Sequence, residues 1–176
     1  QLLRELKGEK CFSIDRYPKT KKNISSSRTF SKKTNSYEEI SKHISRNVSR
    51  CAKKLREQKS CAGFIGISIR TSPYDYKQEY LYFSRAAVID TPTNNTIELI
   101  KISMYLLKNI YKQNINYIKS KVFIGDIIPS NRVQTNLFDI KKDRRELDKS
   151  IDAINSLMGR DTTVSYTHLT LPTSVT

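Results

Sequence analysis

The sequence has few of the residues on which most catalytic sites are built, and this scarcity excludes several kinds of chemistry. Histidine occurs only at His43 and His168, so neither a metal-binding cluster nor a histidine-activated nucleophile is predicted. The five glycines are scattered and cannot form a phosphate-binding loop. The three cysteines, Cys11, Cys51 and Cys61, give no CxxC pair and no disulfide framework. This pattern fits a reducing compartment, and we expect a cytoplasmic protein.

Long apolar runs are absent as well. No stretch of about 18 apolar residues predicts a membrane span, and no charged-then-apolar segment opens the chain. The chain begins "QLLRELKGEK" without methionine, which we interpret as an N-terminal truncation. Residues 164–176, "VSYTHLTLPTSVT", are similar to translated sequencing-adapter text. We expect an artefact there and leave the segment out of fold reasoning, with a genuine polar tail as the alternative.

Positive charge is abundant and unevenly placed. The chain has 32 Lys and Arg against 17 Asp and Glu, a net charge of +15, and residues 1–60 hold 17 basic and 6 acidic side chains. Such a basic half favours a polyanionic partner, most commonly nucleic acid. The alternative is compositional, because Lys, Ile, Asn and Tyr are all abundant, as an AT-rich genome would produce.

Two amphipathic helices are predicted. Residues 35–58 start with the capping pair Ser36 and Glu39, and a second helix follows the capping pair Asn95 and Glu98. In both, apolar residues recur at helical spacing. The predicted buried stripes are Ile40, Ile44, Val48, Cys51 and Leu55 in the first helix, and Ile97, Ile100, Met104, Leu107 and Tyr111 in the second.

Strands are predicted over residues 23–34, 61–74, 79–91 and 116–127, where side chains alternate in character. With the helices, the order is strand, helix, strand, strand, helix, strand. This order predicts an α+β fold of the split βαβ type, a βαββαβ unit whose four-stranded sheet carries two helices on one face. A linker and a short helix over 143–158 follow, with Leu147, Ile151, Ile154 and Met158 on one side of that helix.

The uncovered face of this sheet is predicted to contact the phosphates of a nucleic acid. Arginine and lysine supply charge, and hydroxyl side chains let backbone amides approach a phosphate oxygen. No base-reading constellation is present, so we expect backbone contact without strong sequence preference. An ordinary solvated face is the alternative. The residues assigned to this face are Ser26, Arg28, Ser68, Arg70, Lys119 and Lys121.

A Leu-Phe pair stands in a segment too short and polar to be core, "VQTNLFD" at residues 133–139. Leu137 and Phe138 could enter a hydrophobic pocket on a partner, gaining about 1.5–3 kcal/mol each, while the Gln134 amide forms hydrogen bonds at its rim. Ordering the segment takes back part of this, so a weak, exchangeable contact is expected. The alternative is a local staple, with both side chains packed on their own domain.

Several short motifs, taken together and in this order, resemble the C-terminal part of the UmuC type of Y-family translesion DNA polymerase, the catalytic subunit type of DNA polymerase V. The resemblance runs from about residue 3 to residue 163. It rests on "RELKGEKC" (4–11), "ISSSRTFSKKT" (24–34), "SRCAKKLREQKS" (49–60), "IRTSPY" (69–74), "TPT" (91–93), "GD" (125–126), "QTNLFD" (134–139) and "DAINSLMGRDT" (152–162).

The resemblance implies a domain plan and site residues. Residues 1–22 would tether the polymerase core, 23–130 would form the DNA-binding little finger, 131–142 a linker, and 143–163 a C-terminal helical tail. The linker would hold a sliding-clamp peptide of Gln134, Leu137 and Phe138. The family's serine-serine-arginine strand falls on Ser26, Ser27 and Arg28, and Lys32 and Lys33 of the same motif join the predicted phosphate contacts.

The resemblance also implies a function: error-prone translesion synthesis in DNA repair and the SOS response. The implied partners are primer-template DNA, the β sliding clamp, processed UmuD-type subunits and a recombinase filament. The family's palm, with its carboxylates and Mg²⁺, would lie outside this sequence. We therefore expect this chain to bind DNA without a cofactor of its own and not to polymerise. Thr135 replaces the commoner leucine of the clamp peptide, which weakens that contact.

Two other functions stay open. One is a free-standing nucleic-acid-binding split βαβ module of the kind that stacks RNA bases on sheet aromatics, for which Phe30 and Phe123 are the candidates. The other is an adaptor domain whose positive charge is incidental.

Overall fold

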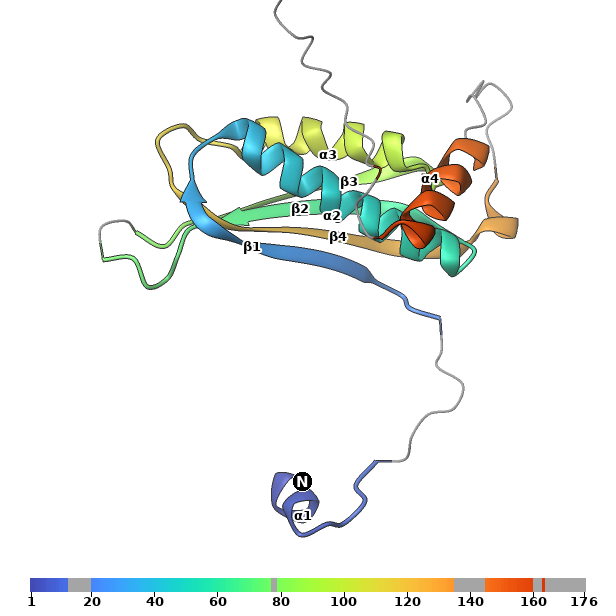
Figure 1. Cartoon of the computed structure of the whole chain (residues 1–176), viewed down its shortest axis with the longest axis horizontal. Helices are drawn as coiled ribbons and strands as arrows, with labels where there is room; N and C mark the ends of the chain where they lie inside the picture. The colour runs from blue at the N-terminus through green and yellow to red at the C-terminus, as the bar shows by residue number, and fades with distance from the viewer. Residues whose placement is uncertain (13–19, 77–78, 135–144, 160–162, 164–176) are drawn as a thin grey trace, which may run out of the picture.

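The computed structural model describes residues 1–12, 20–76, 79–134, 145–159 and 163. Its strands and helices follow the predicted order of the βαββαβ unit, with a short helix before it and another after it (Figure 1). The elements are α1 (Leu2–Leu6), β1 (Ile24–Thr34), α2 (Tyr37–Glu57), β2 (Ser60–Arg70), β3 (Tyr82–Thr93), α3 (Thr96–Ile110), β4 (Tyr117–Pro129), the 3-10 helix η1 (Ser130–Arg132) and α4 (Arg145–Leu157).

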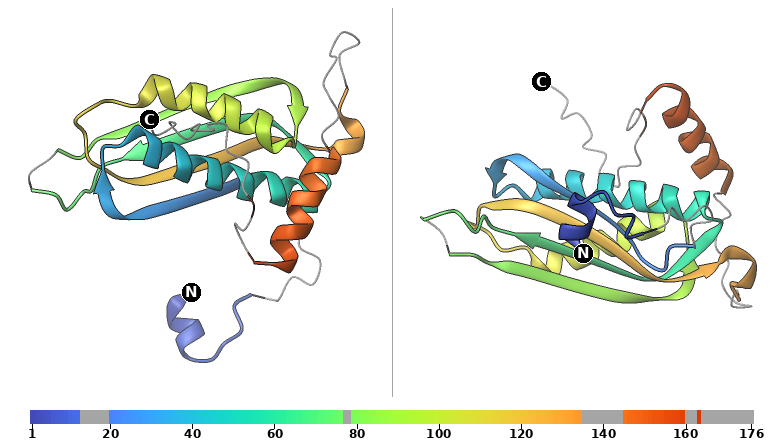
Figure 2. Two further views of the ribbon diagram at one scale, coloured as in Figure 1. Left: turned by 45° about the horizontal axis from the view of Figure 1, so that its top comes forward. Right: turned by 90° about the horizontal axis from the view of Figure 1, so that it is seen from below.

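The four strands form one antiparallel sheet in the order β1-β4-β2-β3. Helices α2 and α3 lie on the same side of this sheet and leave its other side uncovered (Figures 1 and 2). The predicted α+β split βαβ fold is therefore confirmed, and β1 and β3 are its edge strands. None of the helices in the described part of the chain is long and apolar enough to cross a membrane.

Both predicted helix caps are present. The Ser36 hydroxyl accepts a hydrogen bond of 3.4 Å from the Glu39 backbone N–H. The Asn95 side-chain oxygen accepts bonds of 3.0 and 3.1 Å from the backbone N–H groups of Ile97 and Glu98. Each cap satisfies backbone donors that a helix start leaves unpaired, which fixes where α2 and α3 begin.

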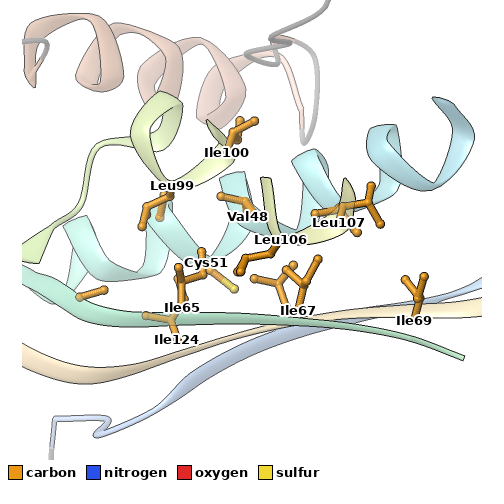
Figure 3. Close-up of a cluster of buried hydrophobic side chains, with 14 of the residues drawn as sticks. Val48, Cys51, Ile65, Ile67, Ile69, Leu99, Ile100, Leu106, Leu107 and Ile124 are labelled. Atoms are coloured by element: carbon orange, nitrogen blue, oxygen red, sulfur yellow. The ribbon is translucent and has the colours of Figure 1, made fainter. Parts of the chain in front are cut away.

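The core lies between the sheet and the two helices (Figure 3). Ile65, Ile67 and Ile69 of β2 belong to this core and are fully buried, as their alternation predicts. The predicted stripe of α2 is confirmed in full, since Ile40, Ile44, Val48, Cys51 and Leu55 have no exposed surface. Burying a side chain of this kind contributes about 1.5–3 kcal/mol.

The buried stripe of α3 differs from the prediction. Ile100 and Leu107 are buried as expected, but Ile97, Met104 and Tyr111 are only half-buried. The buried arc is instead Thr96, Leu99, Ile100, Ser103, Leu106, Leu107 and Ile110. It is centred elsewhere because α3 packs against α2 as well as against β2 and β3, so two neighbouring surfaces cover it.

Candidate nucleic-acid interface

The register of the sheet defines which side chains share its uncovered side. Residues paired across antiparallel strands project to the same side, and alternate residues of one strand project to opposite sides. Because Ile65, Ile67 and Ile69 point to the helices, the residues between them point away. We call the resulting surface the open face. It consists of Ser25, Ser27 and Thr29 of β1, Phe64, Gly66, Ser68 and Arg70 of β2, Tyr82, Ser84, Ala86 and Val88 of β3, and Lys119, Lys121, Phe123 and Gly125 of β4.

Two rows at one end of the open face carry its positive charge, and we call them the cationic rows. The strand pairings align Thr29, Lys119, Arg70 and Tyr82 in the first row, and Ser27, Lys121, Ser68 and Ser84 in the second. The two rows hold three cations, four aliphatic hydroxyls and a phenol, and no acid. The exposed members of this set offer charge and hydrogen-bond donors to phosphate oxygens without presenting a base-reading pattern, whereas Ser68 is buried among them.

The hydroxyls of the cationic rows interact with one another. A hydrogen bond with Ser68 is the main cause that lowers the pKa of the Tyr82 phenol, opposed by partial burial and aided by Ser84, Lys121 and Arg70. The Ser84 hydroxyl donates a bond of 3.2 Å to the carbonyl of Ile67. These contacts hold the side chains of Ser68, Tyr82 and Ser84 in place beside the cations.

The middle of the open face is apolar. The Phe123 ring lies directly over Gly66, where a Cβ atom would come within 2.1 Å of the ring. Phe64 lies beside that ring, with centroids 5.9 Å apart. A glycine is required at position 66 for the ring to lie this close. No residue in this middle part of the open face is charged, so the positive charge of the face is confined to the cationic rows.

Ser68, Arg70, Lys119 and Lys121 lie on the open face as predicted, although Ser68 itself is buried. Ser27, which only the family motif had assigned to phosphate contact, lies on this face as well. Thr29, Tyr82 and Ser84 complete the rows, and the sequence-based prediction of this face did not include them. Their signal was their alternate positions in β1 and β3, which becomes readable only once the strand register is known.

The placement of Ser26 and Arg28 on the open face is wrong. Both share the side of Ile24 and Phe30, which are buried beneath α2. The half-buried Ser26 hydroxyl donates a hydrogen bond of 3.0 Å to the side-chain oxygen of Asn47 in α2.

Arg28 is exposed at the β1 edge, on the same side as α2. It pairs with the fully buried Ser120 and is close enough to His43 of α2 to lower that residue's pKa. The physical reason for the error is that β1 carries small polar residues on both sides, so its alternation is weak. Its two large apolar residues, Ile24 and Phe30, mark the buried side and were the available signal.

Phe30 is likewise not an open-face aromatic. It is 6% exposed and stacks on His43 with centroids 4.5 Å apart. The base-stacking alternative that relied on Phe30 and Phe123 therefore has only Phe123 on the open face. Lys32 and Lys33 are exposed near the end of β1, and Lys33 forms an ion pair with Asp75 of the β2–β3 connection.

The proposed clamp peptide lies mostly outside the described residues. Gln134 is described and exposed, whereas Leu137 and Phe138 are not among the described residues. Within the described part of the chain, no three His, Cys, Asp or Glu side chains gather closely enough to hold a metal ion.

Comparison with known proteins places this fold in a family. Residues 21–137 match the impB/mucB/samB family C-terminal domain. The chain is 30% identical over 159 residues to the protein UmuC of Salmonella typhimurium strain LT2, covering 90% of this chain and 38% of that protein. It is 29% identical over 156 residues to the protein SamB of Salmonella typhimurium, covering 87% of this chain and 37% of SamB.

One solved structure that matches this chain is the complex of the beta-clamp processivity factor and the little finger domain of PolIV. Its TM-score is 0.46 at 13% sequence identity, covering 66% of this chain and 98% of that chain. The chain spans 38% and 37% of the lengths of UmuC and SamB. Since the family match takes in most of the sequence, the chain belongs to the impB/mucB/samB family and carries its C-terminal domain, which confirms the UmuC-type resemblance of its motifs.

Proposed function

We propose that this chain is the DNA-binding and clamp-binding C-terminal portion of an error-prone translesion DNA polymerase that acts in DNA repair and the SOS response in the cytoplasm. The observation that carries the proposal is the pair of cationic rows. Arg70, Lys119 and Lys121 stand among hydroxyl side chains, without an acid, on a sheet face that no described element covers. The metal-dependent chemistry of the whole polymerase is assigned to no residue of this chain.

The geometry favours contact with a duplex backbone. Each cationic row crosses the four β-strands, and the two rows are two residues apart along each strand, about 6–7 Å. The cations of the two rows can therefore reach successive phosphates along one DNA strand. Arg70 can bond a phosphate through two N–H groups at once, whereas Lys119 and Lys121 act as point charges. Contacts with phosphates carry no sequence information, and the cationic rows present no pattern that would read base edges. Binding is therefore expected to be insensitive to DNA sequence.

The test is DNA binding by fluorescence anisotropy over a range of salt concentrations. Changing Lys121 to Ala should weaken binding on all sequences alike and lower the log–log salt slope by about 0.9, the value of one phosphate contact. Lys42 is exposed on α2, outside the open face, and Lys42→Ala makes the same charge change as a matched control. Equal effects of the two substitutions would show that only net charge matters.

Arg28 lies at the edge of the surface that bound DNA is proposed to cover. Its phosphate contact stays a prediction, and its position at the β1 edge restricts it to a backbone that passes around that edge. Arg28→Ala compared with Lys121→Ala therefore measures whether bound DNA reaches past β1.

Clamp binding is the second part of the proposal, through Gln134, Leu137 and Phe138. It is supported by the sequence "QTNLF", which begins at the second residue after η1. The printed partner of the PolIV little finger is a clamp, and we extend that partner to this chain as a proposal. Processed UmuD-type subunits and a recombinase filament are further proposed partners.

The free-standing module is the remaining alternative. It requires bases stacked on the sheet, and Phe30 is buried beneath α2 while Phe123 packs over Gly66. A strong preference for RNA over duplex DNA would favour that alternative.

A further inference from the structure

The connection between β2 and β3 concentrates tyrosines that the proposed function does not use. Tyr74 is 86% exposed, Tyr76 is fully exposed, and Tyr80 is about half exposed. Tyr82, which follows at the start of β3, is also exposed. Large rings left in water contribute nothing to the core, and several of them gathered in one short connection form a candidate binding surface.

The base of this connection is held by specific hydrogen bonds. Thr71 is 1% exposed, and its hydroxyl accepts a bond of 2.8 Å from the Leu81 N–H and donates one of 3.1 Å to the Glu79 carbonyl. The Thr71 N–H also donates to the Leu81 carbonyl at 3.0 Å. The Ser72 hydroxyl accepts from the Tyr74 N–H at 3.3 Å. The tyrosines therefore stand on a closed, bonded turn base.

The connection projects beyond the sheet at the end where β1 leads into α2 (Figures 1 and 2). The cationic rows lie at this same end, since Tyr82 pairs with Arg70, and Arg70 with Lys119. The ion pair between Lys33 and Asp75 ties the connection to β1 and neutralises one of its acids. Glu79, at the base, is its other described acid. The tyrosines thus continue directly from the proposed DNA-binding surface.

Exposed rings beside cations suit one ligand chemistry in particular. Unpaired bases stack on aromatic side chains whatever their sequence, while nearby cations contact the strand's phosphates. Bases inside a duplex are already stacked on one another and cannot offer their faces. A tyrosine cluster placed past the end of a phosphate-binding face is therefore suited to the strand that leaves the duplex.

We propose that Tyr74 and Tyr76, with Tyr80 and Tyr82 nearer the sheet, form a stacking site for the unpaired bases of a DNA strand that extends from a duplex held on the open face. The duplex location rests on the proposed function, whereas the stacking site rests on the tyrosines themselves. The site extends the footprint from double-stranded to single-stranded DNA at one end of the domain.

The experiment measures the affinity of the full chain for a blunt duplex and for the same duplex with an oligothymidine overhang on either strand. The overhang should strengthen binding about tenfold through stacking on the tyrosines. Changing Tyr74 and Tyr76 together to Ala should remove that gain and leave blunt-duplex affinity unchanged. Changing both to Phe keeps the rings and should keep the gain. Tyr105 is 67% exposed on α3, and Tyr105→Ala is the matched control.

Each outcome decides between the two proposals. An overhang that adds nothing, a gain that survives the double Ala change, or an equal loss on blunt duplex would each overturn the stacking site. Failure to bind blunt duplex at all would overturn the open-face proposal instead, and binding of free oligothymidine would then test the tyrosines alone. Thermal unfolding checks the double variant, and Tyr76→Ala, which alters only a fully exposed ring, serves if that variant does not fold.

Discussion

The guanidinium of Arg56 in α2 holds the carboxylate of Asp152 in α4 with two hydrogen bonds, of 2.6 Å from Nε and 2.9 Å from a terminal nitrogen. Asp148, one turn earlier in α4, lies 3.6 Å from the same guanidinium and is almost fully buried. Arg56 also bonds the Asn94 carbonyl and the Thr96 hydroxyl, at 3.0 and 2.8 Å. The C-terminal helix is thus docked through charge on the junction of α2 and α3.

The side of α4 that faces the domain is unexpected. Of the predicted apolar side, Leu147, Ile154 and Met158 remain exposed, and only Ile151 is partly buried. The acidic side of the helix supplies the contact because Arg56 gives it a partner that an apolar stripe would lack. Arg56 should therefore control whether α4 is docked.

Replacing Arg56 with Ala should release α4 and lower the free energy of unfolding. Removing the guanidinium leaves the buried Asp148 without its ion-pair partner and the Thr96 hydroxyl without its donor. A loss of about 1–3 kcal/mol is typical when a buried group loses its partner. Thermal unfolding and limited proteolysis within α4 would measure the two effects. Lysine should not restore docking, because it cannot form two parallel bonds to Asp152.

The matched control for that change is Lys53→Ala. Lys53 also joins α2 to α4, because its ammonium group donates a hydrogen bond of 3.2 Å to the Ser156 hydroxyl, but this contact is exposed. Exposed contacts contribute little, so this variant should unfold within about 0.5 kcal/mol of the parent. Equal losses for Lys53 and Arg56 would contradict the assignment of docking to the guanidinium.

Changing Leu137 and Phe138 together to Ala should abolish capture by a bacterial sliding clamp. Burial of each side chain in the clamp pocket would contribute about 1.5–3 kcal/mol to the binding free energy. Losing both contributions would leave a weak contact without measurable affinity. Duplex affinity should stay within twofold of the parent, because the cationic rows are untouched. Clamp capture that persists in the double variant would mean that another surface of this chain binds the clamp.

His43 should make the protein less stable as pH falls below neutral. Burial, followed by the charges of Arg28 and Arg46, lowers the pKa of His43 from its ordinary 6.5, with Glu39 opposing. The unfolded chain then binds a proton that the folded chain resists, so stability is fully present above the unfolded pKa and is lost as pH falls from there through the lower pKa of the folded state. The melting temperature measured from pH 7 to about pH 5 tests this.

The variant His43→Phe should flatten that pH dependence, because it keeps a ring stacked on Phe30 and removes the titrating group. A slope that is the same in the parent and in His43→Phe would assign the effect to other groups.

Local sequence patterns predicted the elements of this fold because the signals are strong over short distances. Ile65, Ile67 and Ile69 alternate with small or polar residues, and Ser36 and Asn95 cap the helices that follow them. The spacing of apolar residues in α2 likewise predicted its buried side, because that single apolar stripe is the side that faces the core.

Contacts between elements decided what those patterns left open. Ser26 and Ser27 are adjacent and chemically identical, yet one bonds Asn47 beneath the helix and the other lies beside Lys121 on the open face. Side-chain direction follows from pairing with β4, and no property of either serine encodes it.

The sequence alone thus determined the order of elements, their caps, the excess of positive charge and the family motifs, all of which depend on residues close together in the chain. Only the tertiary structure decided which cations share a face, where the tyrosines stand relative to them and which side of α4 docks. Those relations join residues far apart in sequence, and strand register and helix packing set them by burying as much apolar surface as the whole domain allows.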